Sequence, residues 1–231
     1  MINLSLVIPA HNSEKVIGKS VETYCSFFSG KVEKMEIIAV CNGCSDNTVK
    51  ICNELKEKFP VKIVELPQKG KGYALIEGFN NSQYEIVGFL DADNPFDLNK
   101  IMKMIDLLER ADVVIASKYL RKQLRVQDSL LRRIISIGGG MVSKVLFNLD
   151  VSDTQAGAKF FRKKVWDRIS LRGFVCKGFD FDIEFLYKAK KARFKILEFY
   201  VPLEKYVGFS TFRVKYLPGM LKRLIKLRFL G

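Results

Sequence analysis

The sequence lacks the features that mark secreted, membrane-spanning or disordered proteins. Its 231 residues include five cysteines, an odd number without the dense spacing of a disulfide scaffold. No stretch of about 18 residues is both apolar and free of charge, since even Ile134 to Val151 contains Lys144 and Asp150. The N-terminus has no basic region followed by an apolar run, and no linker, repeat or low-complexity segment interrupts the chain. We therefore expect one globular domain in a reducing, cytoplasmic compartment.

Several familiar chemical motifs are also absent. The only Gly-Lys-Ser begins at Gly18, and Ser13 stands where a Walker loop needs its first glycine. The single histidine, His11, is remote in sequence from Cys41 and Cys44, so a structural zinc site lacks ligands and a strand-end turn is favoured. His11 itself is expected to be a neutral, hydrogen-bonded histidine rather than a catalytic base. No serine, histidine and carboxylate arrangement stands out.

The composition is apolar enough to form a core, and it has a strong excess of positive charge. Apolar residues make up 48% of the chain, which is enough for a globular interior. Lysine and arginine number 39 against 25 acidic residues, a net charge of +14. Such a surface attracts nucleic acid, an anionic membrane or a phosphorylated substrate.

Short apolar runs alternate with helical periodicity through the first half of the chain. Strands are predicted at 4–9, 35–40, 61–66, 85–90 and 112–116, and helices at 14–28, 46–58, 73–80 and 98–110. Each parallel pair of strands needs a crossover, so this order predicts a mainly parallel sheet with helices on both faces. Beyond residue 120, a basic helical region and a mixed tail suggest an elaboration of the same domain. Ligands bind such sheets at the carboxyl ends of the strands, where the turns after Pro9, Val40, Leu66 and Leu90 should converge.

Two of these turns contain residues that suit the binding of a metal ion or a phosphate group. Asp91 and Asp93 follow an apolar strand and are suited to holding a divalent cation, whereas the alternative, a helix cap, is better filled by Asp97. The turn at 68–72, Gln-Lys-Gly-Lys-Gly, combines glycines that let the backbone approach a ligand with two cations that suit phosphate. Taken alone, a solvated turn is the better interpretation of that segment.

In their order, these segments resemble the family 2 glycosyltransferases with the GT-A fold, a Rossmann-like α/β domain. Residues 6–12, Leu-Val-Ile-Pro-Ala-His-Asn, resemble the opening strand and nucleotide-contacting turn. Residues 36–48 resemble the second strand and its turn, although Cys41 and Asn42 stand where the family usually has two acids. Residues 69–72 are similar to the Gly-Lys-Gly turn, and Asp91-Ala92-Asp93 to the metal-binding Asp-X-Asp.

Later segments resemble the dolichyl-phosphate and polyprenyl-phosphate sugar synthases of that family. Residues 114–119 are similar to a Gly-Ser-Arg-Tyr stretch, and residues 153–159 to an Asp-Thr-Gln-X-Gly-Phe-Lys turn. Residues 181–186 are similar to a Phe-Asp-X-Glu-Leu-Leu helix start. Arg132 and Ser136 resemble the basic and hydroxyl residues that hold phosphate in these enzymes.

The resemblance implies an inverting, Mg²⁺- or Mn²⁺-dependent transfer of a sugar from a UDP- or GDP-linked donor to a polyprenyl or dolichyl phosphate. The donor would bind to residues 1–120 and the acceptor to residues 121–215. The expected donor contacts are Pro9, Ala10, Asn12, Asn42, Lys69, Gly70, Lys71, Gly72, Asp91, Ala92 and Asp93, with Asp91 and Asp93 as metal ligands. Lys118, Arg132 and Ser136 would hold the acceptor phosphate.

The expected catalytic residues are Asp93, Lys118, Arg132 and Asp182. A lipid phosphate is already an anion near neutral pH and needs no strong base, whereas a sugar hydroxyl acceptor would make Asp182 the candidate base. Asp182 is also a candidate N-cap for a helix at 183–192. Two alternatives stand beside the lipid phosphate: a sugar hydroxyl of a glycan or glycolipid, and a basic nucleic-acid-binding domain. The second is disfavoured because the cationic run 121–133 contains no aromatic residue for base stacking.

The segment 216–231 combines four cations with large apolar residues. A helix there would gather Leu221, Leu224, Ile225 and Leu227 on one broad apolar face with cations at its border. Such a helix either packs on the domain or binds an anionic bilayer surface. We expect a peripheral anchor at the cytoplasmic face of a membrane. The sequence does not indicate the oligomeric state.

Overall fold

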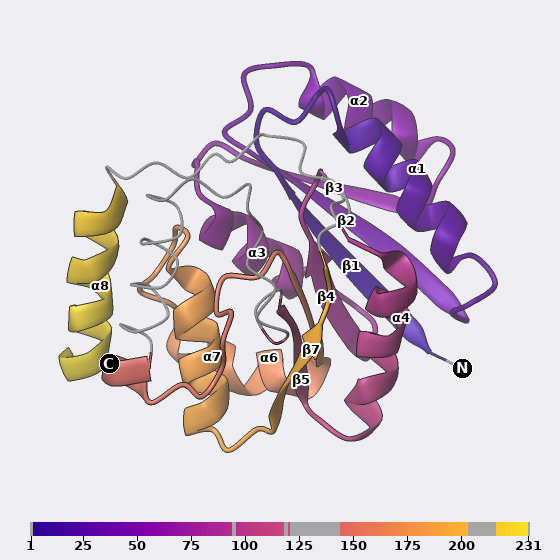
Figure 1. Cartoon of the computed structure of the whole chain (residues 1–231). Coiled ribbons are helices and arrows are strands. Elements are labelled where there is room, and N and C mark those ends of the chain that lie inside the picture. The colour runs from indigo at the N-terminus through magenta and orange to yellow at the C-terminus, as the bar shows by residue number, and fades with distance from the viewer. Residues whose placement is uncertain (1, 94–95, 118–119, 121–143, 203–215, 231) are drawn as a thin grey trace.

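The computed structural model describes residues 2–93, 96–117, 120, 144–202 and 216–230. These residues form one seven-stranded sheet with helices on both faces (Figure 1). The strand order is β3-β2-β1-β4-β6-β5-β7, and every neighbouring pair is parallel except the two that β6 makes. The predicted α/β domain with a mainly parallel mixed sheet is confirmed.

The first half of the chain folds as its pattern predicts. Its strands are β1 (Asn3–Ala10), β2 (Lys34–Asn42), β3 (Val61–Leu66), β4 (Ile86–Leu90) and β5 (Val113–Ser117). Its helices are α1 (Ile17–Phe28), α2 (Thr48–Lys56), α3 (Lys71–Asn80) and α4 (Leu98–Asp106), and the short 3-10 helix η1 (Leu107–Glu109) extends α4. The carboxylate of Asp97 caps α4 by accepting hydrogen bonds from the backbone N–H groups of Asn99 and Lys100. Asp91 and Asp93 are therefore not needed as caps.

The second half contains two strands that the pattern does not predict. β6 (Ala158–Arg162) lies between β4 and β5 and runs antiparallel to both. It leads into α6 (Lys163–Ile169), η2 (Ser170–Arg172), α7 (Phe181–Lys191) and the edge strand β7 (Ile196–Tyr200). β6 and β7 have five residues each and include Lys159 and Glu198. Neither strand therefore shows an uninterrupted apolar run.

The helices form two layers, each with its own apolar core. On one face, Tyr24 of α1, Cys52 of α2 and Ile101 of α4 are buried in one cluster with sheet residues. On the other face, side chains of α3, α6 and α7 form a second cluster that is rich in aromatic rings. Both faces of the sheet are covered, as expected for a mainly parallel sheet.

The register of the central strands sets the place where a site can form. Ala10, the last residue of β1, pairs with Cys41, and Asn42 at the end of β2 pairs with Leu66 at the end of β3. On the other side of β1, Val7 pairs with Phe89 near the end of β4. The turns after all four strands therefore leave the sheet at the same edge.

The C-terminal helix α8 (Leu217–Leu230) lies at the edge of the domain (Figure 1). It buries Met220, Leu224 and Leu227 and leaves Leu221 and Ile225 exposed. The single apolar face expected for this helix is thus divided between the domain and the surface. None of the described helices combines the length and the apolar character needed to cross a bilayer.

Candidate active site

The turns that follow β1 and β2 are bonded to each other. The side-chain oxygen of Asn12 accepts a hydrogen bond from the backbone N–H of Ser45 at 2.8 Å, and the N–H of Ser13 donates to the hydroxyl of Thr48 at 2.7 Å. The carboxylate of Asp46 accepts from both the N–H and the hydroxyl of Thr48. Burial raises the pKa of Asp46, but these hydrogen bonds outweigh it and lower the pKa. The hydrogen bonds of Asn12 and Ser13 therefore fix the two turns relative to one another, and Asp46 holds Thr48 in place.

The residues at the end of β2 form a strand-end turn, as the sequence favoured. Nδ1 of His11 lies 2.8 Å from the carbonyl oxygen of Asn42, which confirms the expected hydrogen-bonded histidine. Gly43 adopts a positive φ of 59°. The thiol of Cys41 is buried 3.8 Å from that of Cys52 in α2. Asn42 is only 3% exposed, so little of its surface is open to a nucleotide.

The glycine turn at 69–72 packs against the backbone of Lys177. The N–H of Tyr73 donates to the carbonyl of Lys177 at 3.2 Å. A Cβ atom at Gly70 would lie 2.7 Å from that oxygen, and one at Gly72 would lie 2.6 Å from its carbon. The glycines thus admit a neighbouring protein segment, whereas the sequence taken alone favoured a solvated turn. Lys69 remains exposed at the start of the turn.

Helix α1 and the loop before β6 hold the backbone of residues 91–93. The hydroxyl of Tyr24 donates to the carbonyl of Asp91 at 2.9 Å, and that of Ser20 donates to the carbonyl of Ala92 at 2.6 Å. The N–H of Asp91 donates to Gly157, whose missing side chain leaves room for the Asp91 carboxylate. Helix α1 and one loop therefore determine where the two carboxylates lie.

A fixed positive charge accompanies Asp91. Nζ of Lys71 lies 3.0 Å from the Asp91 carboxylate and 4.8 Å from the centre of the Phe89 ring. Burial lowers the pKa of Lys71, but the carboxylates of Asp91, Asp182 and Asp93 outweigh it, so the pKa is raised. Lys71 therefore stays protonated beside the carboxylate pair.

One carboxylate oxygen of Asp93 has no hydrogen-bond donor among the described residues. Burial, followed by the charge of Asp91, raises the pKa of Asp93 to about 6. Its Oδ1 atom is buried, and no described residue donates a hydrogen bond to it. A buried carboxylate oxygen without a donor is stabilised by a cation. The described His, Cys, Asp and Glu side chains form no group of three that could hold a metal ion by itself. Asp91 and Asp93 thus fit a divalent cation that would take its other oxygen ligands from phosphate and water.

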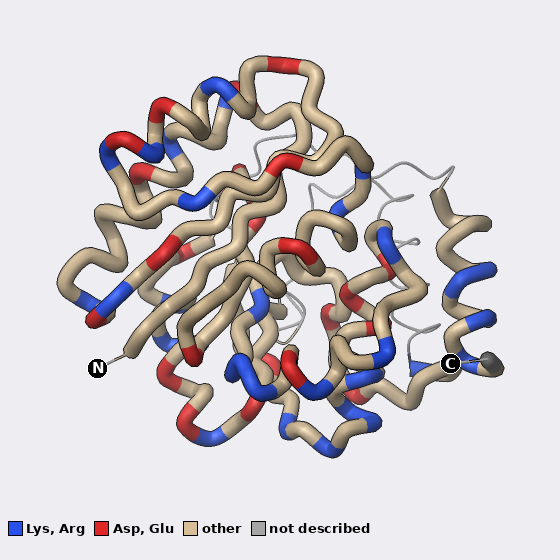
Figure 2. Tube along the Cα trace, turned by 180° about the vertical axis from the view of Figure 1, so that it is seen from behind, with Lys and Arg blue, Asp and Glu red and all other residues tan. Residues whose placement is uncertain are grey.

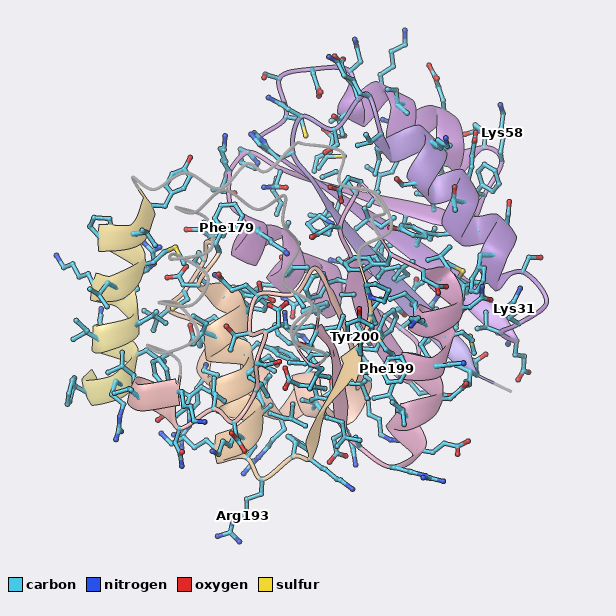
Figure 3. All side chains as sticks on the ribbon, viewed as in Figure 1. Lys31, Lys58, Phe179, Arg193, Phe199 and Tyr200 are labelled. Atoms are coloured by element: carbon cyan, nitrogen blue, oxygen red, sulfur yellow. The ribbon has the colours of Figure 1, made fainter. Side chains whose placement is uncertain are left out.

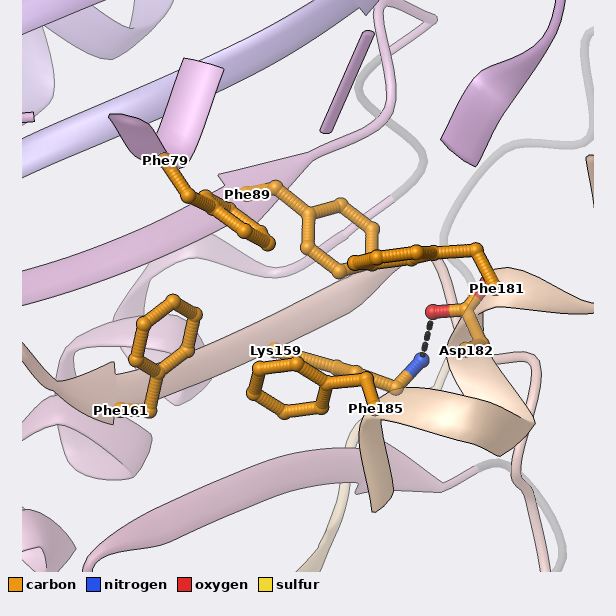
Figure 4. Close-up of a pocket in the computed structure, with 7 residues that line it drawn as sticks. All are labelled: Phe79, Phe89, Lys159, Phe161, Phe181, Asp182 and Phe185. Carbon is orange, nitrogen blue, oxygen red and sulfur yellow. Dashed lines mark hydrogen bonds and ion pairs between the residues drawn. The ribbon is translucent and has the colours of Figure 1, made fainter. Parts of the chain in front are cut away.

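Asp182 forms a buried ion pair with Lys159 of β6. Figure 4 shows their contact, which measures 2.6 Å, and the two side chains are 2% and 1% exposed. Phenylalanine rings enclose the pair and leave no room for water; they are Phe79, Phe89, Phe161, Phe181 and Phe185. Burial lowers the pKa of Lys159, an effect that Asp182 opposes. The predicted capping role of Asp182 is wrong, because α7 begins at Phe181, two residues before the predicted start, and Asp180 is the residue at its N-cap.

Acidic residues at the start of α7 fix the segment that meets the glycine turn. The buried carboxylate of Glu184 accepts hydrogen bonds from the N–H groups of Val175 and Cys176. Asp180 is fully buried and accepts from the N–H of Gly178 and from Arg223 of α8, the latter at 2.5 Å. The Asp180 hydrogen bond raises the pKa of Arg223 despite partial burial. Contacts therefore connect α8, the start of α7 and the glycine turn.

The structure brings most of the predicted site residues together, and the others lie outside the residues that it describes. Those at one edge of the sheet are Pro9, Ala10, Asn12, Asn42, Lys69, Gly70, Lys71, Gly72, Asp91, Ala92 and Asp93. Asp182 lies close enough to Lys71 to influence its pKa. The predicted phosphate contacts Lys118, Arg132 and Ser136 lie outside the described residues.

Sequence patterns missed several residues that shape this site. Lys159 pairs with Asp182, Tyr24 holds the backbone of Asp91, and Lys177 closes on the glycine turn. A lysine inside a short apolar strand was a signal for a buried ion pair. Tyr24 occupied an ordinary apolar position of a helix, and nothing distinguished it.

Comparison with known proteins identifies the family of this architecture. The family model described as "Glycosyl transferase family 2" matches residues 5–170. A dolichyl-phosphate beta-glucosyltransferase from Dictyostelium discoideum is 27% identical over 99% of this chain and 74% of the relative. A dolichol-phosphate mannosyltransferase from Pyrococcus furiosus is 26% identical over 83% of this chain and 54% of the relative.

Solved structures of similar fold come from glycosyltransferases. Glucosyl-3-phosphoglycerate synthase from Mycobacterium tuberculosis, in complex with Mn²⁺, UDP and phosphoglyceric acid, superposes with a TM-score of 0.71. It is 20% identical and covers 97% of this chain and 76% of its own. Mannosyl-3-phosphoglycerate synthase from Rubrobacter xylanophilus has a TM-score of 0.66 at 14% identity, with 97% and 72% coverage. These likenesses confirm the predicted GT-A fold.

Proposed function

The chain belongs to glycosyl transferase family 2, and we propose that it transfers a sugar from a UDP- or GDP-linked donor to a polyprenyl or dolichyl phosphate. The relatives named above as dolichyl-phosphate glucosyltransferase and dolichol-phosphate mannosyltransferase support this acceptor. We further propose that the reaction inverts the anomeric carbon and requires Mg²⁺ or Mn²⁺. The observation that carries the proposal is the Asp91 and Asp93 pair at the edge of the sheet where ligands bind, with a buried oxygen to which no described residue donates a hydrogen bond.

The donor site would be built from the turns after β1, β2, β3 and β4. Transfer leaves a nucleoside diphosphate, and the enzyme must stabilise its negative charge. Lys71, held in its charged form, and the exposed Lys69 lie on the turn that would face the diphosphate. A divalent cation on Asp91 and Asp93 would neutralise charge on the same diphosphate. Asn12 and the turn after β2 would contact the nucleoside.

The state of Asp182 favours a phosphate acceptor over a sugar hydroxyl. A hydroxyl nucleophile needs a base that is accessible and unpaired. Asp182 is enclosed by aromatic rings and bonded to Lys159, so a proton taken up there would break a buried ion pair. A phosphate monoester already carries negative charge near neutral pH and needs no such base. Lys118, Arg132 and Ser136 are the residues that we propose for holding that phosphate.

The proposal is tested by combining the protein with Mg²⁺ or Mn²⁺, a panel of UDP- and GDP-linked sugars and a polyprenyl phosphate. Release of nucleoside diphosphate and formation of a lipid-linked sugar are measured together. We expect one donor to give both products and excess chelator to abolish them.

The matched variants in this assay are Asp93→Asn and Asp106→Asn. Asp93→Asn keeps the shape of the side chain but removes a metal ligand, and we expect a loss of about a hundredfold or more. Asp106 is an exposed carboxylate at the end of α4, so Asp106→Asn should retain full activity. Undiminished transfer by Asp93→Asn in excess chelator would contradict the metal-dependent mechanism.

A further inference from the structure

Helix α8 has two apolar faces, of which the domain covers only one. Met220, Leu224 and Leu227 are buried, and the last two belong to the apolar cluster that side chains of α3, α6 and α7 form. Leu221, Ile225 and Phe229 are spaced four residues apart and are 46%, 45% and 74% exposed. With 3.6 residues per turn, these three side chains form a continuous line along the outer side of the helix, which we call the outer stripe.

Cations border the outer stripe on both sides. Lys222 and Lys226 are exposed on one side, and Arg228 is exposed on the other. The helix contains no acidic residue, and Figure 2 shows its lysines and arginines from behind the domain. An apolar line between cations matches the chemistry of a bilayer surface with anionic headgroups, where apolar side chains insert and cations remain among the phosphates.

The helix is fastened to the segment that meets the candidate donor site. Arg223 binds the buried carboxylate of Asp180 at 2.5 Å. The ring of Phe179, which Figure 3 labels, lies 6.2 Å from that of Tyr216, the residue before the helix. The neighbouring Lys177 contacts the glycine turn at Gly70 and Gly72. The outer stripe therefore has a fixed direction relative to the edge of the sheet that carries Asp91 and Asp93.

We propose that the outer stripe and its bordering cations dock the enzyme on an anionic lipid bilayer, so that a membrane-embedded acceptor can reach the candidate site. The proposal rests on the proposed function, because a lipid-phosphate acceptor lies in a membrane. Each Lys or Arg near an anionic surface strengthens binding about fivefold, and the three apolar side chains add a comparable or larger factor each. A second copy of the chain is a poorer occupant, because pairing two such helices would bring like charges together.

Binding to vesicles tests the docking separately from catalysis. Flotation with phosphatidylserine-containing vesicles is compared with flotation on neutral phosphatidylcholine vesicles. We expect the wild-type protein to bind the anionic vesicles about tenfold or more tightly. The triple variant Leu221→Gln/Ile225→Gln/Phe229→Gln should lose about tenfold or more of that binding while its thermal unfolding remains unchanged, since all three side chains are exposed.

The charge variant is Lys222→Gln/Lys226→Gln/Arg228→Gln, and its matched control is Lys50→Gln/Lys56→Gln/Lys58→Gln. The control removes the same number of exposed charges at α2, which Figure 1 shows on the opposite side of the sheet from α8. The apolar control is Val145→Gln/Leu171→Gln, two exposed side chains outside the stripe. We expect both controls to bind vesicles as the wild type does. Equal binding by the wild type and both α8 variants, or no binding by the wild type, would overturn the proposal.

A soluble acceptor separates failure of the docking from failure of the proposed function. With a short-chain isoprenyl phosphate in solution, the α8 variants should match the wild-type rate, because the outer stripe lies outside the donor site. With a long-chain polyprenyl phosphate in anionic vesicles, they should be slowed about tenfold or more. Equal rates on both acceptors for all variants would overturn the docking while leaving the proposed activity intact.

Discussion

The absence of a side chain at Gly157 keeps Asp91 in its place. The carbonyl of Gly157 accepts a hydrogen bond from the Asp91 N–H, and a Cβ atom there would overlap the Asp91 carboxylate. The sequence located Asp91 and Asp93 because carboxylates that directly follow an apolar strand are informative by themselves. It did not reveal Gly157 as their neighbour, because that contact joins segments 66 residues apart and depends on the path of the folded chain.

The variant Gly157→Ala tests this contact. The added methyl group should displace the Asp91 carboxylate and reduce Mn²⁺-dependent nucleotide binding by about tenfold. Mutating a residue that positions a metal ligand commonly lowers metal affinity by about that factor. Isothermal titration with UDP, GDP and Mn²⁺ measures the change.

The matched control is Gly18→Ala in α1, where the new Cβ would make only an ordinary contact with Ile51 at 3.6 Å. That control should bind as the wild type does and gain about 0.5 to 1 kcal/mol in free energy of unfolding, since alanine favours a helix over glycine. Unchanged binding by Gly157→Ala would contradict the assigned contact.

Removing the charge of Asp93 should not destabilise the metal-free protein. The pKa of Asp93 is raised to about 6 from 3.8, so folding disfavours its charged form. Above pH 6 this unfavourable contribution is fully present, and it disappears as the pH falls towards 4. In chelator, Asp93→Asn should therefore be at least as stable as the wild type at pH 7.5, and its advantage should vanish near pH 4. Urea unfolding at the two pH values measures this, and a variant less stable at pH 7.5 would contradict the raised pKa.

A buried ion pair joins β6 to α7, beside the packed rings of Phe161 and Phe185. Lys159 comes from a strand that the sequence did not predict, and Asp182 from a helix that it did predict. Their ion pair could therefore not be predicted from the sequence. The alternation of strands and helices predicted β1 to β5 because each lies in a regular crossover unit. It failed for β6, which inserts antiparallel between two strands, and for β7, whose short run is interrupted by Glu198.

Breaking this pair on one side should be far more damaging than replacing both partners. Lys159→Met leaves the Asp182 carboxylate buried without a partner, and we expect a loss of about 3 to 5 kcal/mol in free energy of unfolding. The double variant Lys159→Met/Asp182→Leu removes both charges among the surrounding rings and should recover most of that loss. Urea denaturation of the three proteins measures the difference, and a double variant less stable than the single one would contradict the proposed energetics.

The attachment of α8 can be tested by amide exchange. Arg223→Gln removes the cation that pairs with Asp180, and a charge-assisted bond that is partly exposed contributes about 1 kcal/mol. Exchange in α8 should accelerate roughly fivefold. Arg228→Gln removes an exposed charge from the same helix and should leave exchange unchanged. The sequence predicted this helix, but not that its apolar residues divide between the domain and the surface.

The whole chain brings a carboxylate pair, lysines and a glycine turn to one edge of a single sheet. The net charge of +14 suggested an anionic partner, and the proposed function directs that expectation towards nucleotide sugars and phosphates. The fold of the described residues 2–117 was predictable because their motifs lie at regular strand ends. The fold of the described residues from 144 onwards was less predictable, because their contacts join elements that no local pattern relates.

The acceptor class is tested most directly by two lipids that share one polyprenyl chain, one ending in a phosphate and the other in a hydroxyl. Each is offered with the same labelled nucleotide sugar and Mn²⁺, and the labelled lipid product is quantified. We predict that the sugar is transferred to the phosphate about a hundredfold or more faster, because the phosphate is already anionic and Asp182 is not available as a base. Equal or faster transfer to the hydroxyl would contradict the assignment of a lipid phosphate as the acceptor.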